Sequence, residues 1–154
     1  MTAKAMKGIT FQVRKLESEN PPAIVSGEKP IRDFKDLEVW RAARTLRAEL
    51  HKLSLLLPDH EKFALATPLR RAAISVTANI AEGFGRFGYE ENAQMCRQAR
   101  GSVYEIRDHL TTCVDQCYVS VEEARRLDRL AQRVAQMLNG YLRATLALKA
   151  AESR

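Results

Sequence analysis

The fold is decided by one stretch of the chain, Leu69-Arg70-Arg71-Ala72-Ala73-Ile74-Ser75-Val76-Thr77-Ala78-Asn79-Ile80-Ala81-Glu82-Gly83. Its apolar residues recur at spacings of three and four, so they lie on one face of a helix. Those residues are Leu69, Ala73, Val76 and Ile80. Thr67 is suited to cap this helix and Pro68 to occupy its first position, while Gly83 is suited to end it. The stretch therefore predicts an amphipathic, Ala-rich helix.

Polar residues interrupt this helix at Arg70, Arg71, Asn79 and Glu82. Small residues let neighbouring helices approach closely, so we expect these groups near packed seams, where a buried polar group must be hydrogen-bonded. Asn79 and Glu82 are expected to bond to facing helices and fix their register. The alternative is a catalytic carboxylate at Glu82, with Glu105 as its acid–base partner. Internal salt bridges to Arg70 and Arg71 explain the two carboxylates more simply.

Three further amphipathic helices are predicted: one from Asp33 or Phe34 to Leu57, one from Tyr89 to Tyr118, and one that starts at Ser120. In the third helix of the chain, Gly101 suggests a close approach by another helix. Four helices joined by short loops predict an all-α, antiparallel up-down-up-down bundle over residues 33–150. The last helix carries a second apolar band, which is either a broad core face or a face covered by another subunit. The members of this band are Leu130, Met137, Leu142 and Leu146.

Residues 1–32 differ from the rest because they combine Pro21-Pro22, Gly27 and Pro30 with mixed charges. Such segments do not bury enough apolar surface to order themselves, so we predict a flexible N-terminal extension. Within it, the stretch from Ile9 to Arg14 alternates apolar and polar residues as a strand does. Its apolar members are Ile9, Phe11 and Val13. They form either a docking segment or part of an unstructured extension.

The composition sets broad limits on the class of protein. The chain has 154 residues, 45% of them apolar, which is enough for one domain with a sizeable core. No apolar run approaches the roughly 20 residues that span a membrane. Three cysteines without an export signal favour reduced thiols and a cytoplasmic setting. The net charge of +6 is compatible with a polyanionic partner.

Four segments carry a resemblance to a known family. They are Phe34-Lys35-Asp36-Leu37-Glu38-Val39-Trp40, Leu69-Arg70-Arg71-Ala72-Ala73-Ile74-Ser75, Ala78-Asn79-Ile80-Ala81-Glu82-Gly83 and Gly101-Ser102. In this order and spacing they resemble the four-helix-bundle family of 23S rRNA intervening-sequence proteins, which includes the accessory variability determinants of diversity-generating retroelements. The resemblance spans about Asp33 to Leu148. It implies a homopentamer with a central channel, and its retroelement branch implies a scaffold for a reverse transcriptase and its template RNA.

Arginines recur at helical spacing on the first and last helices. Those on the first helix are Arg41, Arg44 and Arg47, and those on the last are Arg125, Arg126, Arg129 and Arg133. Helical spacing places Arg126, Arg129 and Arg133 on one face. Nearby acidic residues partly offset them, so an ordinary solvated mixed face is the alternative. Repeated by rotational symmetry, the arrays would form a basic ring that holds phosphates without reading bases.

The loop Gly83-Phe84-Gly85-Arg86-Phe87-Gly88 matches the GxGxxG pattern. A dinucleotide site requires this pattern to follow a strand and open a helix, whereas here it follows a helix. Arg86 lies between two Phe residues and is therefore a candidate for phosphate contact and base stacking. The competing interpretation is that one or both Phe rings close the end of the bundle.

The sequence gives little support for a metal site or a catalytic site. His109, Cys113 and Cys117 are spaced by four residues, but zinc requires four ligands, or three and a water. Cys113 and Cys117 also fall on the predicted core stripe, where free Cys behaves as an apolar residue. The motifs of metalloproteases, serine hydrolases and phosphate loops are absent from the sequence. We expect no metal, no cofactor and no enzymatic activity.

The sequence therefore predicts a non-enzymatic helical-bundle protein that binds nucleic acid, with structured RNA favoured over DNA. Its binding residues would be the seven arginines of the first and last helices together with Arg86. The alternative is an accessory scaffold for a reverse transcriptase and its template RNA. The basic surface is common to both hypotheses.

Overall fold

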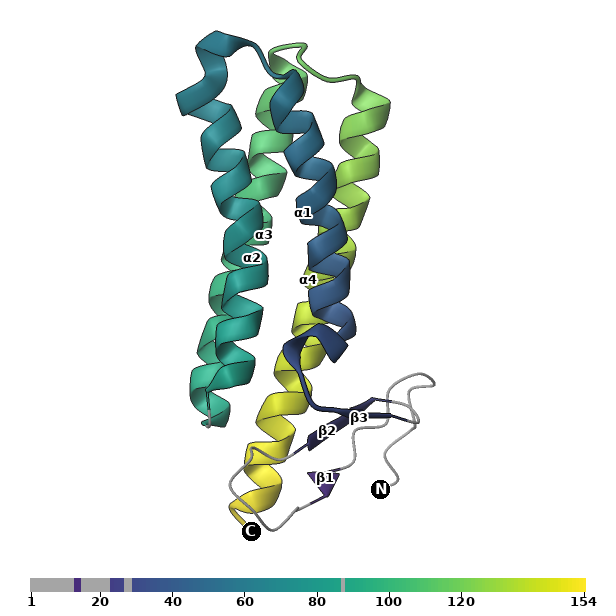
Figure 1. The fold of residues 1–154 in the computed structure, drawn as a ribbon, viewed down its shortest axis with the longest axis vertical. Coiled ribbons are helices and arrows are strands. Elements are labelled where there is room, and N and C mark those ends of the chain that lie inside the picture. The colour runs from purple at the N-terminus through teal and green to yellow at the C-terminus, as the bar shows by residue number, and fades with distance from the viewer. Residues whose placement is uncertain (1–12, 15–22, 27–28, 87) are drawn as a thin grey trace.

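A computed structural model describes residues 13–14, 23–26, 29–86 and 88–154 of the chain. Its long helices are α1 (Glu38–Leu56), α2 (Thr67–Gly85), α3 (Tyr89–Asp115) and α4 (Val121–Glu152). Consecutive helices pack against each other and run in opposite directions, and α1 also packs against α4 (Figure 1). The prediction of an all-α four-helix bundle is therefore confirmed.

Part of the N-terminal segment forms a small antiparallel sheet at one end of the bundle (Figure 1). Its strands are β1 (Val13–Arg14), β2 (Ala23–Ser26) and β3 (Lys29–Ile31), in the order β1-β2-β3. Val13 pairs with Ile24, and Ile24 pairs with Ile31. Ile31 is buried in the bundle core and thereby attaches the sheet to it. Ile9 and Phe11 of the expected docking segment lie outside the described residues, and the flexibility of residues 1–32 stays a prediction.

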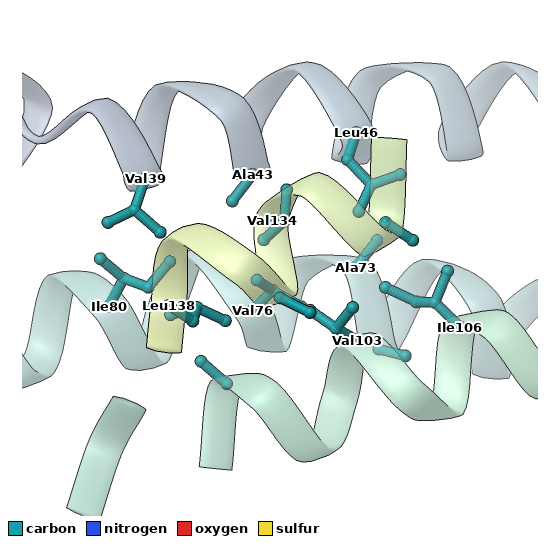
Figure 2. Close-up of a cluster of buried hydrophobic side chains, with 14 of the residues drawn as sticks. Val39, Ala43, Leu46, Ala73, Val76, Ile80, Val103, Ile106, Val134 and Leu138 are labelled. Atoms are coloured by element: carbon teal, nitrogen blue, oxygen red, sulfur yellow. The ribbon is translucent and has the colours of Figure 1, made fainter. Parts of the chain in front are cut away.

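The main core cluster is drawn from all four helices (Figure 2), and a second, smaller cluster consists of Leu57, Leu65, Ala66 and Cys113. Every residue of the α2 apolar face is buried, as its spacing predicts. The apolar residues of α1 that recur at alternating steps of four and three, a heptad pattern, are buried as well. They are Val39, Ala43, Leu46, Leu50 and Leu53. Leu130, Met137 and Leu142 of the second α4 band are half-buried against this same core, which fits the broad-core interpretation. Truncating a fully buried Leu in such a core typically costs about 2–5 kcal/mol.

The start of the bundle is capped one turn before α1. A short 3₁₀ turn, η1 (Phe34–Asp36), precedes the helix, and Asp33 Oδ1 accepts a hydrogen bond from the Lys35 amide at 2.8 Å. Asp36 Oδ2 accepts from the backbone amides of Arg32 and Asp33, each at 3.0 Å. These two bonds hold the pKa of Asp36 below its ordinary value. The predicted start at residue 33 or 34 is thus the start of this turn, and α1 itself begins at Glu38.

Two predicted ends of α2 are wrong. The helix continues directly from the short helices η2 (Asp59–Glu61) and η3 (Lys62–Ala66), so Thr67 has helical dihedrals and its side chain caps nothing. At the other end, Gly83 is buried inside the helix. A Cβ on Gly83 would lie 2.8 Å from Asn92 Oδ1 and 2.9 Å from Met95 Cβ, so glycine here lets α3 approach. Gly101, where we expected such an approach, is exposed and has open space beside it.

The predicted end of the third helix is also too late. The α3 helix ends at Asp115, and Cys117 adopts a left-handed φ of 59°. The Cys117 amide donates to the carbonyl oxygen of Val114 at 2.9 Å, and the Tyr118 amide donates to that of Cys113 at 2.8 Å. This is the Schellman arrangement, whose left-handed position glycine usually occupies. Cys113 is buried as predicted, whereas Cys117 is exposed because the chain has already left the helix.

We predict that Cys117→Gly raises the free energy of unfolding by about 0.5–1 kcal/mol. The left-handed conformation costs an L-residue about 1–2 kcal/mol, and the larger entropy of glycine in the unfolded chain offsets part of the gain. Urea denaturation under reducing conditions measures the change. Cys117→Ala, which removes the thiol but keeps Cβ, should give no gain. Equal gains from both variants would show that the thiol, rather than the backbone, is responsible.

Candidate nucleic-acid interface

The outer face of α4 carries an exposed row of arginines. Arg125, Arg129 and Arg133 are all exposed and recur every four residues, so their Cα atoms rise about 6 Å per step along one face. Among the residues that the structure describes, no acidic side chain forms an ion pair with any of these three. We call these three residues the α4 arginine row. Its guanidinium groups face solvent without an ion pair to the described residues.

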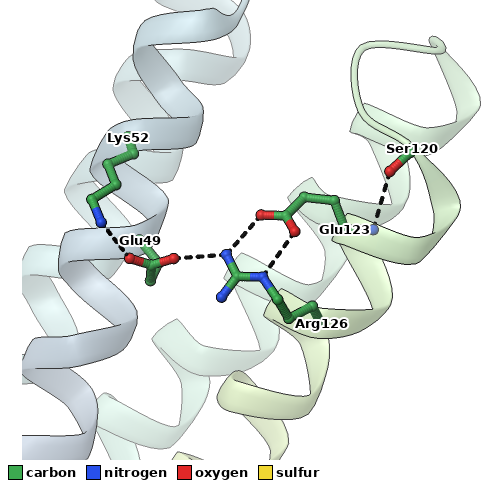
Figure 3. Close-up of polar contacts among 5 residues, drawn as sticks. All are labelled: Glu49, Lys52, Ser120, Glu123 and Arg126. Carbon is green, nitrogen blue, oxygen red and sulfur yellow. Dashed lines mark hydrogen bonds and ion pairs between the residues drawn. The ribbon is translucent and has the colours of Figure 1, made fainter.

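Arg126 does not belong to this row, because it is turned toward α1 (Figure 3). Its Nη2 lies 2.7 Å from Glu49 Oε2 and 2.7 Å from Glu123 Oε1, and its Nε donates to Glu123 Oε2 at 2.8 Å. Lys52 Nζ donates to the other oxygen of Glu49 at 2.7 Å. The grouping of Arg126 with Arg129 and Arg133 therefore needs correction, and Arg125 takes its place. Glu123 lies three residues before Arg126 on the same helix, but helical spacing alone could not reveal Glu49, which belongs to α1.

These contacts shift the ionisation of the whole cluster. Hydrogen bonds from Lys52 and Arg126 hold the pKa of Glu49 below its ordinary value. The bond from Arg126 does the same to the pKa of Glu123. Hydrogen bonds to Glu123 and Glu49 in turn raise the pKa of Arg126 above its ordinary value. Ser120, which caps α4 by accepting from the Glu123 amide at 3.2 Å, places Glu123 for this role (Figure 3).

The arginines of α1 are largely engaged with the bundle. Arg41 is exposed, but its Nε donates to the Lys35 carbonyl oxygen at 2.8 Å. Arg47 Nη1 donates to the Thr77 hydroxyl at 2.8 Å and so joins α1 to α2. Arg44 is exposed, with its Cζ 5.9 Å from the centroid of the Trp40 ring. Arg41 Nη2 also lies 3.9 Å from Asp36 Oδ1, so its charge is partly compensated. Arg44 thus adds positive charge to solvent, whereas Arg47 joins two helices.

Arg86 lies at the end of α2 and pairs with Glu82 one turn earlier, with 2.5 Å between Nη2 and Oε1. Phe84 is half-buried and packs against the core, as expected for a ring that closes the bundle end. Phe87 lies outside the described residues, so the expected stacking of Arg86 between two rings stays a prediction. The glycine pattern begins inside α2, because Gly83 and Gly85 lie within the helix, so it does not have the strand-to-helix setting of a dinucleotide site.

The polar residues of α2 bond mainly within their own helix. Asn79 Nδ2 donates to the carbonyl and hydroxyl oxygens of Ser75 at 2.9 and 3.0 Å, and Ser102 of α3 donates to the Ser75 hydroxyl at 3.0 Å. Asn79 therefore reaches the facing helix only through Ser75. Glu82 is exposed and bonds to Arg86 rather than to a facing helix.

The remaining members of the predicted polar set also lack long-range partners within the described residues. Arg70 is half-buried and lies 3.5 Å from the Thr67 hydroxyl, while Arg71 is exposed. Glu105 is exposed and lies 3.4 Å from His109 Nε2 on its own helix. The expected salt bridges of Glu82 and Glu105 with Arg70 and Arg71 are not formed within the described part of the chain. The two carboxylates each face a different neighbour and do not act as a pair.

Of the three residues with metal-ligand spacing, His109 and Cys113 lie on α3, whereas Cys117 lies beyond its end. Burial raises the pKa of the Cys113 thiol to about 11, so this thiol stays protonated. Cys117 points into solvent beyond the helix end. Within residues 13–14, 23–26, 29–86 and 88–154, no group of three His, Cys, Asp or Glu side chains is placed to hold a metal ion. The described helices likewise include none long and apolar enough to cross a membrane.

Several polar contacts between helices were not predicted. Arg107 Nε donates to Asp128 Oδ1 at 2.7 Å, and Arg100 Nη1 donates to Asn139 Oδ1 at 2.9 Å, so both join α3 to α4. Buried Asn92 donates to the hydroxyl group of Tyr141 at 3.0 Å. These partners are 21 to 49 residues apart in sequence, beyond the reach of helical periodicity. The one feature of the sequence that could have indicated such a contact is a polar residue at a position of the apolar face, as at Asn92.

Comparisons with known proteins agree with this architecture. A family model described as "23S rRNA-intervening sequence protein" matches residues 35–140. A solved structure from Bacteroides thetaiotaomicron, a protein of unknown function from the S23 ribosomal protein family, is similar in fold. It superposes with a TM-score of 0.64 at 16% identity, covering 68% of this chain and 97% of that one. No curated protein matches the chain.

The Arg126 cluster predicts a pH-dependent contribution to stability. Because folding lowers the pKa of Glu49 and Glu123, their contribution is present above their ordinary value of 4.5 and is lost as the pH falls below it. We expect Arg126→Gln to lower Tm by about 1–4 °C at pH 7 and by much less at pH 3. Thermal unfolding followed by circular dichroism measures this. Arg129→Gln is the control and should change Tm little at either pH; a constant effect of Arg126→Gln across the range would contradict the prediction.

Proposed function

Because the chain belongs to the 23S rRNA-intervening sequence protein family, we propose that it binds structured RNA through the α4 arginine row. The observation that carries this proposal is the row itself: three exposed arginines on one helix face with no acidic partner in the described structure. A guanidinium group forms bidentate hydrogen bonds with phosphate oxygens and keeps its charge at any physiological pH. Binding would release counterions and would not read base sequence.

The division of arginines within the bundle supports this assignment. Arg47, Arg107 and Arg126 each bond to a side chain of another helix, so their charge and hydrogen-bonding capacity serve the fold. Arg125, Arg129 and Arg133 retain their donors for a ligand. Steps of about 6 Å along a helix let successive arginines reach successive phosphate groups of a backbone. Arg41, Arg44 and Arg86 would contribute longer-range attraction.

The proposal assigns this protein no catalytic step, cofactor or metal. Glu82 and Glu105, the carboxylates considered for acid–base chemistry, are both exposed and each faces a basic residue of its own helix. General acid–base catalysis requires two groups positioned on one substrate, usually with a shifted pKa. The electrostatic role of the surface arginines is the simpler account of the chain's +6 charge.

A protein-binding role is the second candidate. Leu55, Leu56 and Phe63 are 65, 79 and 80% exposed, and they lie close in sequence around the connection between α1 and α2. Exposed apolar clusters of this kind favour protein contacts. They are compatible with the scaffold role that the resemblance implies, in which a reverse transcriptase and its template RNA would bind together. In that role the α4 row would contact the template RNA.

We propose a homopentamer as the assembled state. A five-fold ring would repeat the α4 arginine row five times and so multiply its weak individual contacts with RNA. Native mass spectrometry at low micromolar concentration should give a mass five times that of the 17.4 kDa chain. A monomer or dimer under these conditions would contradict the proposal.

The α4 row predicts a specific loss of binding on neutralisation. A triple variant should bind a structured RNA hairpin at least about 10-fold more weakly at 100 mM salt. It replaces Arg125, Arg129 and Arg133 together by Gln. The slope of log affinity against log salt should become shallower by about one for each phosphate group that the variant no longer neutralises. Fluorescence anisotropy measures both, with an equal-length duplex DNA as the competing ligand.

Arg126→Gln is the matched control, because it removes one positive charge from the same helix but outside the row. It should lower thermal stability and leave RNA affinity within about 2-fold. If the triple variant keeps full affinity while remaining folded, the α4 row is not the RNA surface. The protein-binding role would then become the leading candidate.

A further inference from the structure

A groove between α3 and α4 lies beside the first arginine of the α4 row. The groove has a volume of about 440 Å³. Its lining includes Tyr104, Arg107, Asp108, Val121, Arg125 and Asp128. This volume is within the roughly 300–1,000 Å³ of small-molecule sites. Tyr104 is 56% exposed and Val121 is 43% exposed, so both present apolar side-chain surface to the groove. The groove therefore offers an apolar surface that the described chain leaves uncovered.

The aromatic wall of this groove is held in place from α4. Arg107 Cζ lies 5.3 Å from the centroid of the Tyr104 ring, a distance that allows a cation–π contact. Arg107 is itself fixed by Asp128, with Nε 2.7 Å from Oδ1. Gln132 donates to the other carboxylate oxygen of Asp128. Because Asp128 and Gln132 hold Arg107 in place, Arg107 in turn restrains the Tyr104 ring as a stacking surface.

The charged groups on the groove differ in how far they are compensated. Asp128 is neutralised by Arg107, so it does not repel an anion. Arg125 is exposed and forms no ion pair with the described residues. Asp108 is also exposed, and its carboxylate bonds to no described side chain. The groove thus combines an aromatic surface, a free guanidinium and a free hydrogen-bond acceptor.

We propose that this groove receives one unpaired nucleotide of an RNA bound along the α4 row. The base stacks on Tyr104, its phosphate pairs with Arg125, and Asp108 accepts a hydrogen bond from an exocyclic amino group. The inference rests on the proposed RNA-binding function and adds to it a preference for RNA with a bulged or looped-out base. Sequence-specific proteins recognise RNA at such unpaired bases by stacking and hydrogen bonds to the base edge.

A nucleotide fits the groove better than other ligands do. Free phosphate could pair with Arg125 but would leave the Tyr104 ring and the Asp108 acceptor without a partner. An apolar peptide would leave Arg125 and Asp108 buried without partners, which is costly. A nucleotide carries a π-face, an anion and, in adenosine, cytidine or guanosine, an amino donor. Each of its three parts therefore has a complementary group on the groove.

The test compares two RNA hairpins that are closed by abasic loops and have the same number of phosphates, one with a fully paired stem and one with a single bulged adenosine in the stem. Stacking on an aromatic side chain is worth about 5- to 100-fold in affinity per base. By fluorescence anisotropy, the unaltered protein should therefore bind the bulged hairpin at least about 5-fold more tightly. Tyr104→Ala should bind both hairpins equally, whereas Tyr104→Phe should keep the preference. A preference that survives Tyr104→Ala overturns the proposal.

A second measurement separates this inference from the proposed function. NMR titration with the single-stranded tetranucleotide r(AAAA) should perturb the resonances of Tyr104 and its neighbours. If these shift while neither hairpin binds, the groove is a nucleotide site and the α4 row is not an RNA surface. If the hairpins bind equally and the Tyr104 resonances do not shift, the α4 row remains the proposed RNA surface and the groove proposal fails. A change in oligomer mass for Tyr104→Ala, with hairpin preference intact, would instead make the groove a subunit contact.

Discussion

The close packing of α2 against α1 and α3 is the constraint on which the rest of the structure depends. The buried face of α2 consists of Leu69, Val76 and Ile80 together with two alanines and Gly83. The alanines and the glycine are small, so the neighbouring helices can approach closely. At Gly83 a single added carbon would meet Asn92 and Met95 of α3. Since protein interiors are packed as densely as organic crystals, the position of α3 follows from this contact.

Once the helices are this close, polar groups near the seams must find partners. Thr77 is 2% exposed, donates to the Ile74 carbonyl oxygen and accepts from Arg47. Asn92 bonds to Tyr141 across the bundle, and Ser75 links Asn79 to Ser102. A hydrogen bond adds only about 1 kcal/mol net, but an unmade one in the interior costs more. These bonds therefore select one register of the helices rather than supply most of the stability.

The same packing sorts the arginines by role. On α4, Arg126 and Arg125 are neighbours in sequence, yet one is bound by Glu49 and Glu123 while the other is free of described partners on the outer face. One residue along a helix turns a side chain by about 100°, so adjacent positions face different surroundings. Arg107 is fixed by Asp128 and contacts the Tyr104 ring, so its charge is paired within the bundle. The arginines that form no contacts between helices are the ones available to a polyanion.

The sequence by itself determined the four helices, their apolar faces and the buried heptad positions, because helical periodicity is a local property of the chain. It also identified every arginine of the α4 row, although it grouped Arg126 with Arg129 and Arg133. Only the tertiary structure decided which arginines stay free, since the carboxylate of Glu49 is 77 residues away from Arg126. The same holds for the role of Gly83 and for the end of α3 at a left-handed Cys117. Contacts between distant segments depend on which helix lies alongside which, and no local pattern encodes that.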